Sequence, residues 1–435
     1  MINKKISKVL GPMLGIMGFM LTIGVLEVPV LADDNVQADS AYTVSTTAAA
    51  VTYKDYSINV NKSAEQNGVK VTIDKVTGTK HKIKVIVKVE NEKAFDQKEL
   101  DNLIEQVTYG ENNSNGGGTS YDYLDDKTLL LTIEQDSDEQ EYPEKGDLRF
   151  DLVIPTYKVN IGMDVSVDFS ESFKNTLEKD LSVKIPKFDF TLNKLESNSL
   201  GTTINYSKIE KNYSNNHDDL RQLHQSSIIL KTGDKMYKTN HSGSSSTENE
   251  ENDIITTGTY ESELATYERL KDQKDMSIIP VVCNISSDEI NKIYKSNSKS
   301  ESTEKTNANK QTTNNVNYVK SFEFSDGSKG EIYNIERNDN SVKVYCKGNS
   351  EKESLLMASN MDMRYTFLEG NANLYNYYDS SKYMCFYKDS KDATALGYVV
   401  EFDNVEKDKA VDLDFDSLIK EIDKYTIGDE IQLSK

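Results

Sequence analysis

Residues 69–74 read Val-Lys-Val-Thr-Ile-Asp, and residues 83–89 read Ile-Lys-Val-Ile-Val-Lys-Val, with Gly78 between them. In both stretches apolar residues, most of them β-branched, alternate with polar or charged ones. A period of two is typical of half-buried β-strands, and the glycine indicates a turn between them. Further short stretches of strand character lie at 128–133, 148–154 and 163–169. Their number and spacing predict a β-sandwich over residues 53–180.

One stretch inside this region has a different period. In the segment 95–106, Leu100, Leu103 and Ile104 fall on one face of a helix. The spacing predicts a short helix there.

The second region, residues 181–435, has strand character as well but is interrupted. The segments 238–255 and 294–317 consist mainly of Ser, Thr, Asn, Lys and Glu. Such composition cannot bury enough apolar surface to offset the entropy of ordering, so both segments are predicted to be disordered insertions. Between them, residues 278–285, which are apolar except for Asn284, predict a continuous buried strand. Alternation returns after Tyr318, so the second region is predicted to be another β-sandwich.

A short internal repeat connects the two regions. Residues 72–76 read Thr-Ile-Asp-Lys-Val, and residues 191–195 read Thr-Leu-Asn-Lys-Leu, an offset of 119 residues. An alternating strand precedes each copy, and a turn and a second strand follow it. The repeat favours duplication of one sandwich unit.

The N-terminus has the features of an export signal. Lys4, Lys5 and Lys8 precede an uncharged run at 9–26, and alanines follow at positions 32 and 38. This order predicts a signal peptide over residues 1–38, cleaved after Ala32 or Ala38 to leave Asp33 or Asp39 as the first residue. An uncleaved membrane anchor is the alternative, since 18 residues are at the short end of what spans a bilayer. Residues 39–52 are predicted to be a flexible spacer.

Composition restricts the partners. The formal net charge is −21, and the acidic residues are spread along most of the chain. A surface of this charge repels phosphate backbones, so we expect no nucleic-acid partner, and a membrane contact only through the N-terminal segment if it is uncleaved. Cysteines occur only at 283, 346 and 385, too few for a disulfide scaffold. Buried free thiols are expected, and a single disulfide with one thiol left over is the alternative.

No combination of residues predicts a catalytic, cofactor or metal site. His217 and His224 are about two helical turns apart, too far to share a metal ion. Asp412, Asp414 and Asp416 resemble the start of a calcium loop, but position six of that loop is Ser417. A strand with an acidic face, followed by a helix capped by Asp416 or Ser417, fits this stretch better.

Three other groups are expected to be structural. His81 and His241 have no other histidine or cysteine near them in sequence, and they lie in stretches predicted to be a turn and a linker. The acidic run at 134–141 is expected to be a solvated hairpin end, and the Tyr-rich stretch at 375–387 to be one face of a sheet. Motifs for nucleophile elbows, zinc proteases and phosphate loops do not occur.

The opening of the first region resembles a known family. Residues 56–63 read Tyr-Ser-Ile-Asn-Val-Asn-Lys-Ser, followed by Gln-Asn-Gly-Val at 66–69 and Val-Thr-Ile-Asp at 71–74. This sequence is similar to the immunoglobulin-like domain of unknown function that lies on the outer side of anti-sigma-factor-like membrane proteins of Gram-positive bacteria. The resemblance covers roughly 53–155, and a weaker one begins near 181. Only eight residues precede Val9, so it does not extend to a cytoplasmic sigma-factor-binding segment.

The resemblance implies a mainly β protein with two immunoglobulin-like sandwiches in tandem, behind a hydrophobic leader helix. It also implies a non-catalytic binding or sensing ectodomain of the cell envelope, whose partner is an unidentified protein or envelope ligand. The alternatives are an extracellular enzyme acting on cell-wall or other polymer, and a structural surface protein or adhesin. An enzyme would need a cleft that holds ionisable groups of perturbed pKa.

Overall fold

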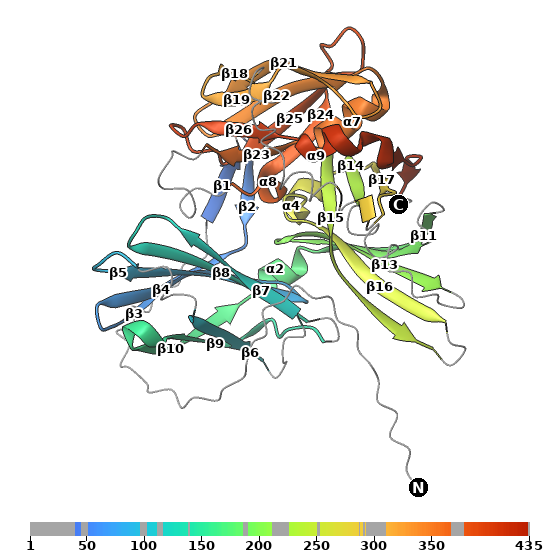
Figure 1. Ribbon diagram of the computed structural model, residues 1–435. Helices are drawn as coiled ribbons and strands as arrows, with labels where there is room; N and C mark the ends of the chain where they lie inside the picture. The colour runs from blue at the N-terminus through green and yellow to red at the C-terminus, as the bar shows by residue number, and fades with distance from the viewer. Residues whose placement is uncertain are drawn as a thin grey trace.

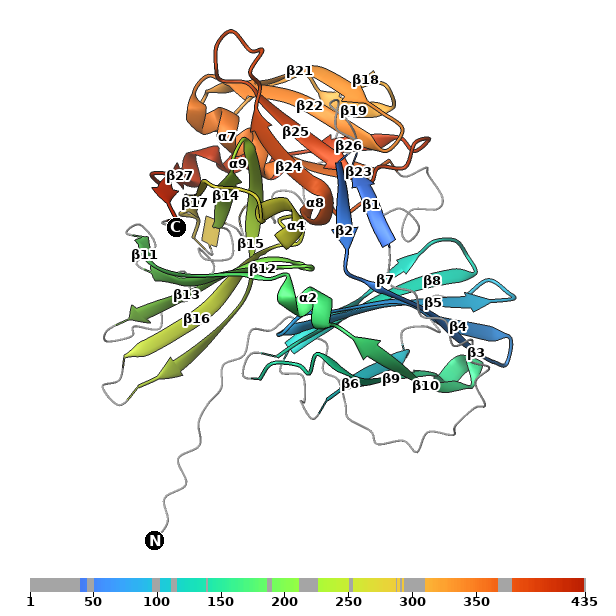
Figure 2. The same cartoon turned by 180° about the vertical axis from the view of Figure 1, so that it is seen from behind.

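The computed structural model describes residues 40–44, 51–95, 102–110, 116–137, 140–185, 190–210, 226–249, 253–286, 288–289, 292, 310–366 and 378–433. The predicted leader at 1–38 lies outside the described residues, as do His217, His224 and the segment 294–309. The described part is mainly β, as the sequence predicts, with antiparallel pairing almost throughout. Figure 1 shows three lobes, and Figure 2 shows them from behind. No helix among the described residues is long and apolar enough to cross a membrane.

The first lobe consists of two sheets that pack face to face. One sheet has the order β3 (Ile58–Gln66), β4 (Val69–Gly78), β5 (Lys82–Asn91), β8 (Thr128–Asp136) and β7 (Gly116–Tyr123). The other has β10 (Val159–Asp168), β9 (Lys145–Ile154) and β6 (Ile104–Tyr109), with η1 (Pro155–Tyr157) and α2 (Ser170–Lys174) beside it. The alternating residues Val69, Val71 and Ile73 are fully buried between the sheets, together with Val85 and Val87. The period of two therefore identifies the core face correctly.

The middle and third lobes share one sheet. Its order is β11 (Leu177–Ile185), β12 (Phe190–Asn198), β13 (Gly201–Glu210), β16 (Ile254–Ser262), β15 (Lys235–Glu248), β24 (Met384–Lys388), β25 (Tyr398–Asp403), β22 (Ser341–Gly348), β21 (Lys329–Arg337) and β20 (Ser321–Glu323). A branch from β15 holds β14 (Ser227–Thr232), β17 (Met276–Cys283), β27 (Tyr425–Ile427) and β28 (Ile431–Gln432). The domain boundary expected at 180/181 falls inside β11.

The third lobe adds a second sheet and most of the helices. The sheet has the order β18 (Lys310–Thr313), β19 (Val316–Val319), β26 (Val411–Asp414) and β23 (Asp362–Tyr365). The helices are α7 (Glu351–Asn360), α8 (Ser380–Tyr383), α9 (Asp416–Glu421) and η2 (Ile422–Lys424), while α4 (Tyr267–Leu270) belongs to the middle lobe. Helix α7 packs against β22.

Strand β17 confirms the buried strand predicted at 278–285, but it ends at Cys283 and Asn284 is exposed. Every residue of β17 is buried. Ile278 and Val282 face the core of the middle lobe, whereas Ile279 and Val281 face the core of the third lobe. A strand with two buried faces has no polar side, so its sequence is almost wholly apolar.

The internal repeat corresponds to a shared irregularity. In β4 the pairing shifts at Asp74, which opposes Val60 and Asn61 of β3. In β12 the pairing shifts at Asn193, which opposes Leu181 and Ser182 of β11. Asn61 and Ser182 have positive φ angles of 51° and 53°. Since β-bulges of one kind occur at matching positions, the two hairpins share their local geometry as well as their sequence.

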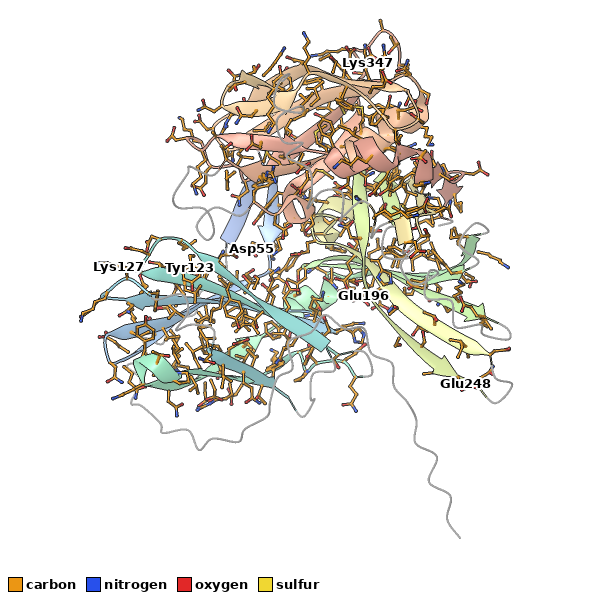
Figure 3. All side chains as sticks on the ribbon, in the orientation of Figure 1. Asp55, Tyr123, Lys127, Glu196, Glu248 and Lys347 are labelled. Atoms are coloured by element: carbon orange, nitrogen blue, oxygen red, sulfur yellow. The ribbon has the colours of Figure 1, made fainter. Side chains whose placement is uncertain are left out.

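Both segments predicted to be disordered insertions contain ordered strands. Residues 238–248 belong to β15, which pairs with β16 from Asn240 to Glu248, and residues 310–317 belong to the β18–β19 hairpin. In the first, Ser245 and Ser246 form hydroxyl contacts with Thr257 and Thr256, at 3.1 and 2.8 Å. Cross-strand hydroxyl pairs of this kind stabilise a sheet that buries little apolar surface. Glu248 lies at the far end of this ribbon (Figure 3).

The β18–β19 hairpin depends on the turn between its strands. Asn314 and Asn315 have φ angles of 52° and 59° and connect the two strands. A two-residue turn of this type needs positive φ at both positions, which asparagine tolerates well. Composition alone gave the wrong prediction because it ignored the turn.

Two further expectations are corrected. The predicted spacer at 39–52 contains β1 (Ser40–Val44), which pairs with β2 (Val51–Asp55). The β-branched and aromatic residues of these stretches favour strands. The helix predicted over 95–106 is replaced at its end by β6, which pairs with β9 from Ile104 onward. Residues 96–101 lie outside the described residues.

Ion pairs connect the first and middle lobes. Nζ of Lys84 lies 2.7 Å from Glu134 of its own lobe and 2.9 Å from Glu263 of the middle lobe. Nζ of Lys82 lies 3.0 Å from Glu261. The acidic run at 134–141 is therefore not simply a solvated hairpin end, because Glu134 lies in this contact between lobes.

Candidate functional site

A polar cavity lies at the junction of the middle and third lobes. Its volume is about 300 Å³. Its walls come from β14, β15, β23, β26, β27 and the ends of α7 and α9, and consist of Ser226, Ser227, Lys238, Asn240, Asn360, Asp362, Asp414, Phe415, Ser417, Leu418 and Tyr425. Most of these side chains donate or accept hydrogen bonds. Only three of them carry a charge: Lys238, Asp362 and Asp414.

Lys238 is the cation of this cavity. Alternation along β15 places Lys238 on the same side as Met236, which belongs to the core of the third lobe. Its Nζ donates to Oδ1 of Asn360 at 2.8 Å. The amide of Asn360 is held in turn, because its Nδ2 donates to the carbonyl of Leu356 at 3.0 Å. The ammonium therefore has a neutral amide as its hydrogen-bond acceptor.

Burial of this ammonium changes its acidity. Desolvation lowers the pKa of Lys238 to about 8, and the charge of Asp362 opposes that shift. Lysines at other partly buried positions of this chain behave differently. Burial also acts against the charge of Lys235, but Cys385 and Glu401 raise its pKa, and Glu401 accepts its hydrogen bond at 2.7 Å. A lysine of lowered pKa in a concave polar site is a feature of binding and catalytic sites.

The two carboxylates of the cavity face each other. Asp362 of β23 is the direct register partner of Asp414 in the antiparallel strand β26. Directly opposite side chains share one face of the sheet at about 4.5–5.5 Å between their Cβ atoms, and like charges there repel each other. Arg364 lies 3.5 Å from Asp414 and neutralises part of this charge. The cavity thus has one cationic group and a pair of adjacent carboxylates.

The hydroxyl groups of the cavity wall are anchored by their own chain. Oγ of Ser226 accepts a hydrogen bond from the backbone N–H of Cys283 at 3.0 Å. Ser226 and Ser227 are buried, as is Tyr425. Cys283 and Tyr425 also form a side-chain hydrogen bond, and burial raises the pKa of the Cys283 thiol to about 12. These contacts fix the part of the wall formed by Ser226 and Tyr425.

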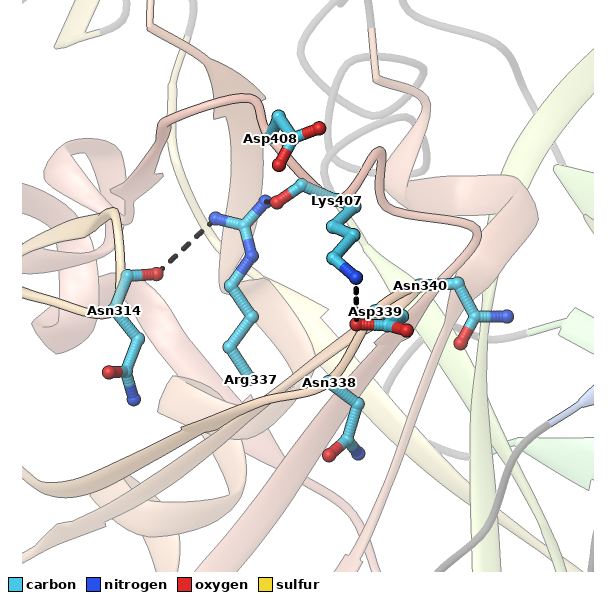
Figure 4. A pocket seen from close by; sticks show the side chains of 7 residues that line it. All are labelled: Asn314, Arg337, Asn338, Asp339, Asn340, Lys407 and Asp408. Carbon is cyan, nitrogen blue, oxygen red and sulfur yellow. Dashed lines mark hydrogen bonds and ion pairs between the residues drawn. The ribbon is translucent and has the colours of Figure 1, made fainter.

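A larger and more open pocket surrounds Arg337 (Figure 4). Its volume is about 660 Å³. The guanidinium donates to five backbone carbonyls, those of Asn314, Asn315, Glu406, Lys407 and Lys409, at 2.6–3.4 Å. Because its donors hold two loops together, Arg337 has a structural role. Lys407 is paired with Asp339 at 2.9 Å on the same surface.

A cluster of buried charges lies on the other face of β15. Glu401 of β25 is 1% exposed and contacts Nζ of Lys235 at 2.7 Å and Nζ of Lys343 at 3.1 Å. Burial opposes ionisation of Glu401, but the two lysines lower its pKa below the ordinary value. Asp403 lies 3.9 Å from Arg269, and burial together with the charge of Glu401 raises its pKa to about 6. The ring of Tyr53 in β2 covers Arg269 at 4.6 Å.

The residues considered from the sequence lie mainly in structural positions. Nδ1 of His81 lies 3.0 Å from the carbonyl oxygen of Ser137, and Nε2 of His241 lies 2.9 Å from the hydroxyl of Tyr206 inside β15 rather than in a linker. The carboxylate of Asp412 accepts a hydrogen bond from the hydroxyl of Thr366 at 3.1 Å.

Three further expectations concern thiols, a helix cap and tyrosines. The three cysteines are free and buried, as expected. The N-cap of α9 is Phe415 rather than Asp416 or Ser417. In the Tyr-rich stretch, the described Tyr378 is buried and donates to the carbonyl of Asp403 at 2.5 Å.

Within the described ranges, no group of three or more His, Cys, Asp or Glu side chains is placed to hold a metal ion. Sequence reasoning missed Lys238 because it falls at the start of the segment read as disordered. The available signal was the Gly233-Asp234 turn, followed by Met236 and Lys238 at strand spacing.

Comparisons with known proteins add little to this description. No protein-family model matches the chain, and no curated protein matches it. Among solved structures, it is similar to the crystal structure of the conserved domain protein from Bacillus anthracis, with 16% sequence identity and a TM-score of 0.37. That similarity covers 53% of this chain and 79% of the other.

Proposed function

We propose that this chain is a non-catalytic binding protein of the cell envelope and that the Lys238 cavity is its ligand site. One observation carries the proposal: a partly buried lysine lines a cavity of about 300 Å³ and has a neutral amide as its hydrogen-bond acceptor. The ammonium has three N–H donors, and one of them is directed at Asn360. The cavity is therefore suited to a ligand that offers an acceptor group to this lysine.

The contacts of the cavity favour binding over catalysis. An activated nucleophile needs a hydrogen bond to its base. Here Nζ of Lys238 donates to Asn360, while Oγ of Ser226 accepts from the backbone. Lys238 is thus held through Asn360, which is itself fixed by the C-terminal turn of α7.

The proposed location rests on the N-terminal sequence. The basic, then apolar, then alanine-containing N-terminus supports export. The two-sheet arrangement of the first lobe supports the immunoglobulin-like assignment, and the matching bulges at Asp74 and Asn193 support a related unit at the start of the middle lobe. In this proposal the first lobe is the support and the junction cavity is the recognition site.

A ligand-capture experiment tests the binding role. The purified protein is incubated with a small-molecule extract of the cell envelope, washed and examined by native mass spectrometry. We expect a bound molecule that the Lys238→Met variant does not retain. The control is Lys347→Met, which removes a lysine that pairs with Glu331 and Asp392 on the surface of the third lobe (Figure 3). Equal capture by wild type and Lys238→Met would contradict the proposal.

A hydrolase is the second candidate. A lysine pKa of about 8 is near the range of a general base, and Ser226 and Ser227 line the same cavity. Turnover of esters or peptides by the wild type, abolished by Ser226→Ala or Ser227→Ala and by Lys238→Met, would favour this function over binding.

A further inference from the structure

We propose that the Lys238 cavity recognises a neutral sugar ring, whose hydroxyl groups bind the side chains of Ser227, Asn240 and Ser417. This inference rests on the proposed binding function and goes further by naming the ligand class. It is drawn from a contrast within the cavity wall. The charged side chains already interact within the chain, whereas these three neutral polar side chains have no hydrogen-bond partner among the described residues.

Two neighbouring strands bring polar groups to one face of the sheet. Ser227 of β14 is the register partner of Asn240 of β15, and Lys238 lies two residues before Asn240 on the same strand. Register partners share a face of a sheet, as do residues two apart on one strand. The same face carries Ile229 and Met236, which belong to the core of the third lobe. This face therefore changes from an apolar core to a polar cavity wall within a few residues.

The charged groups of the cavity interact within the chain. Nζ of Lys238 donates to Asn360 at 2.8 Å, and the charge of Asp362 acts on this lysine. Asp414 lies 3.5 Å from Arg364. With two cations and two carboxylates, the formal charges of this group cancel. Removal of water from a charged ligand is costly unless a new partner compensates it, so this balanced wall favours a ligand without charge.

The neutral polar groups are available to a ligand. Ser227, Asn240 and Ser417 line the cavity, and no hydrogen bond to another described residue engages their side chains. A serine hydroxyl both donates and accepts, and an asparagine amide has two donors and one acceptor oxygen. Neighbouring hydroxyl groups of a sugar also donate and accept, so they match these wall groups. A sugar hydroxyl can in addition accept from Lys238 without bringing a charge.

The apolar part of the wall and the cavity size suit a single ring. Phe415, Leu418 and Tyr425 line the same cavity, and the C–H groups of a sugar ring can pack on such side chains. A volume of about 300 Å³ is at the lower end of the range for ligand sites, about 300–1,000 Å³. It corresponds to about ten water molecules at ~30 Å³ each. This room is sufficient for one sugar ring.

Sugars that differ in charge test the inference. Isothermal titration calorimetry at pH 6.5 and low salt would compare two neutral sugars, glucose and N-acetylglucosamine, with two charged ones. Glucuronate adds a carboxylate, and glucosamine adds an ammonium. We expect at least one neutral sugar to bind, and both charged sugars to bind at least about tenfold more weakly, because the wall offers them no uncompensated charge.

Variants at exposed positions test the wall groups. Asn240 and Ser417 are exposed, so Asn240→Ala and Ser417→Ala should leave the melting temperature unchanged. We expect Asn240→Ala to weaken neutral-sugar binding about fivefold, and the double variant at least about tenfold, from the loss of one and of two hydrogen bonds. The matched control is Ser166→Ala in the first lobe, which removes an exposed hydroxyl that donates to Asp147 and should leave sugar binding unchanged.

The contrary results are distinct from failure of the binding function. Binding of glucuronate or glucosamine as tight as that of the neutral sugars would overturn the inference, as would unchanged sugar affinity in the double variant. Absence of heat with both neutral sugars at millimolar concentration would overturn it too. If envelope capture still depended on Lys238 in these cases, the ligand class would be wrong and the binding function would stand; if capture also failed, both would be wrong.

Discussion

Replacement of Glu401 by glutamine tests the energetics of the buried charge cluster. Glu401 is 1% exposed and is the shared partner of Lys235 and Lys343. Glu401→Gln keeps the shape of the side chain and removes the charge, so two ammonium groups remain near each other without their carboxylate. Loss of one partner of a buried ion pair costs about 3–5 kcal/mol.

The two lysines set where in that range the effect should fall. The side chain of Lys343 is 4% exposed and cannot reach water, whereas that of Lys235 is 26% exposed and can partly resolvate. We therefore expect the lower end, about 3 kcal/mol, for the free energy of unfolding. At about 2–4 °C per kcal/mol for a domain of this size, the melting temperature should fall by about 6–12 °C.

Thermal and urea unfolding, followed by far-ultraviolet circular dichroism, measure this change. The matched control is Glu331→Gln, because Glu331 pairs with Lys347 at 3.4 Å but is 44% exposed, and such pairs contribute about 0–1 kcal/mol. Adding Lys343→Met to Glu401→Gln should recover part of the loss, since an apolar side chain replaces an unpaired charge. A loss below about 1 kcal/mol in Glu401→Gln, equal to the control, would refute the assignment of a desolvated cluster.

Three further outcomes are expected. Because the pKa of Asp403 is raised from 3.8 to about 6 in the folded protein, its stabilising contribution is full only below about pH 3 and is lost as the pH rises through 6. The difference in urea unfolding free energy between wild type and Asp403→Asn should change by about 2.4 kcal/mol between pH 4 and 7, and a constant difference would contradict this. Lys84→Met should weaken the contact between the first and middle lobes by about 1.5–3 kcal/mol and speed hydrogen exchange in β5 and β16, with unchanged exchange as the contrary result. Burial raises the pKa of the thiols of Cys283, Cys346 and Cys385, so a thiol reagent should modify none of them in the native protein and all three after denaturation; rapid native labelling would show that a core opens.

The candidate site was poorly predictable from sequence. Asn360, Asp362 and Asp414 are spread over more than fifty residues, and Lys238 lies more than a hundred residues before them. Local patterns report which face of a strand is buried, but they do not report which distant strands meet. The pairing of Asp362 with Asp414 depends on the register of β23 against β26, which is a tertiary property.

The segments predicted to be disordered show the same limit. The segment 238–255 is nearly devoid of apolar residues, and its composition by itself favours disorder. In the folded chain β16 lies between β13 and β15, so the polar part of β15 gains a ladder of backbone pairing from Asn240 to Glu248. That neighbour is supplied by the fold and not by the segment itself.

What the sequence by itself determined is the local structure. The alternating residues at 69–74 and 83–89 define strands and their buried face, and the apolar residues at 278–283 define a strand buried on both sides. The spacing of the repeat corresponds to a shared bulge. These features follow from side-chain period and backbone sterics, which act over a few residues. The tertiary structure alone decided the continuous sheet through two cores, the ion pairs of Lys82 and Lys84 between lobes, and the cavity around Lys238. Each of these depends on contacts between segments far apart in the chain, because charge pairing and cavity shape are set by distance in space rather than by order in sequence.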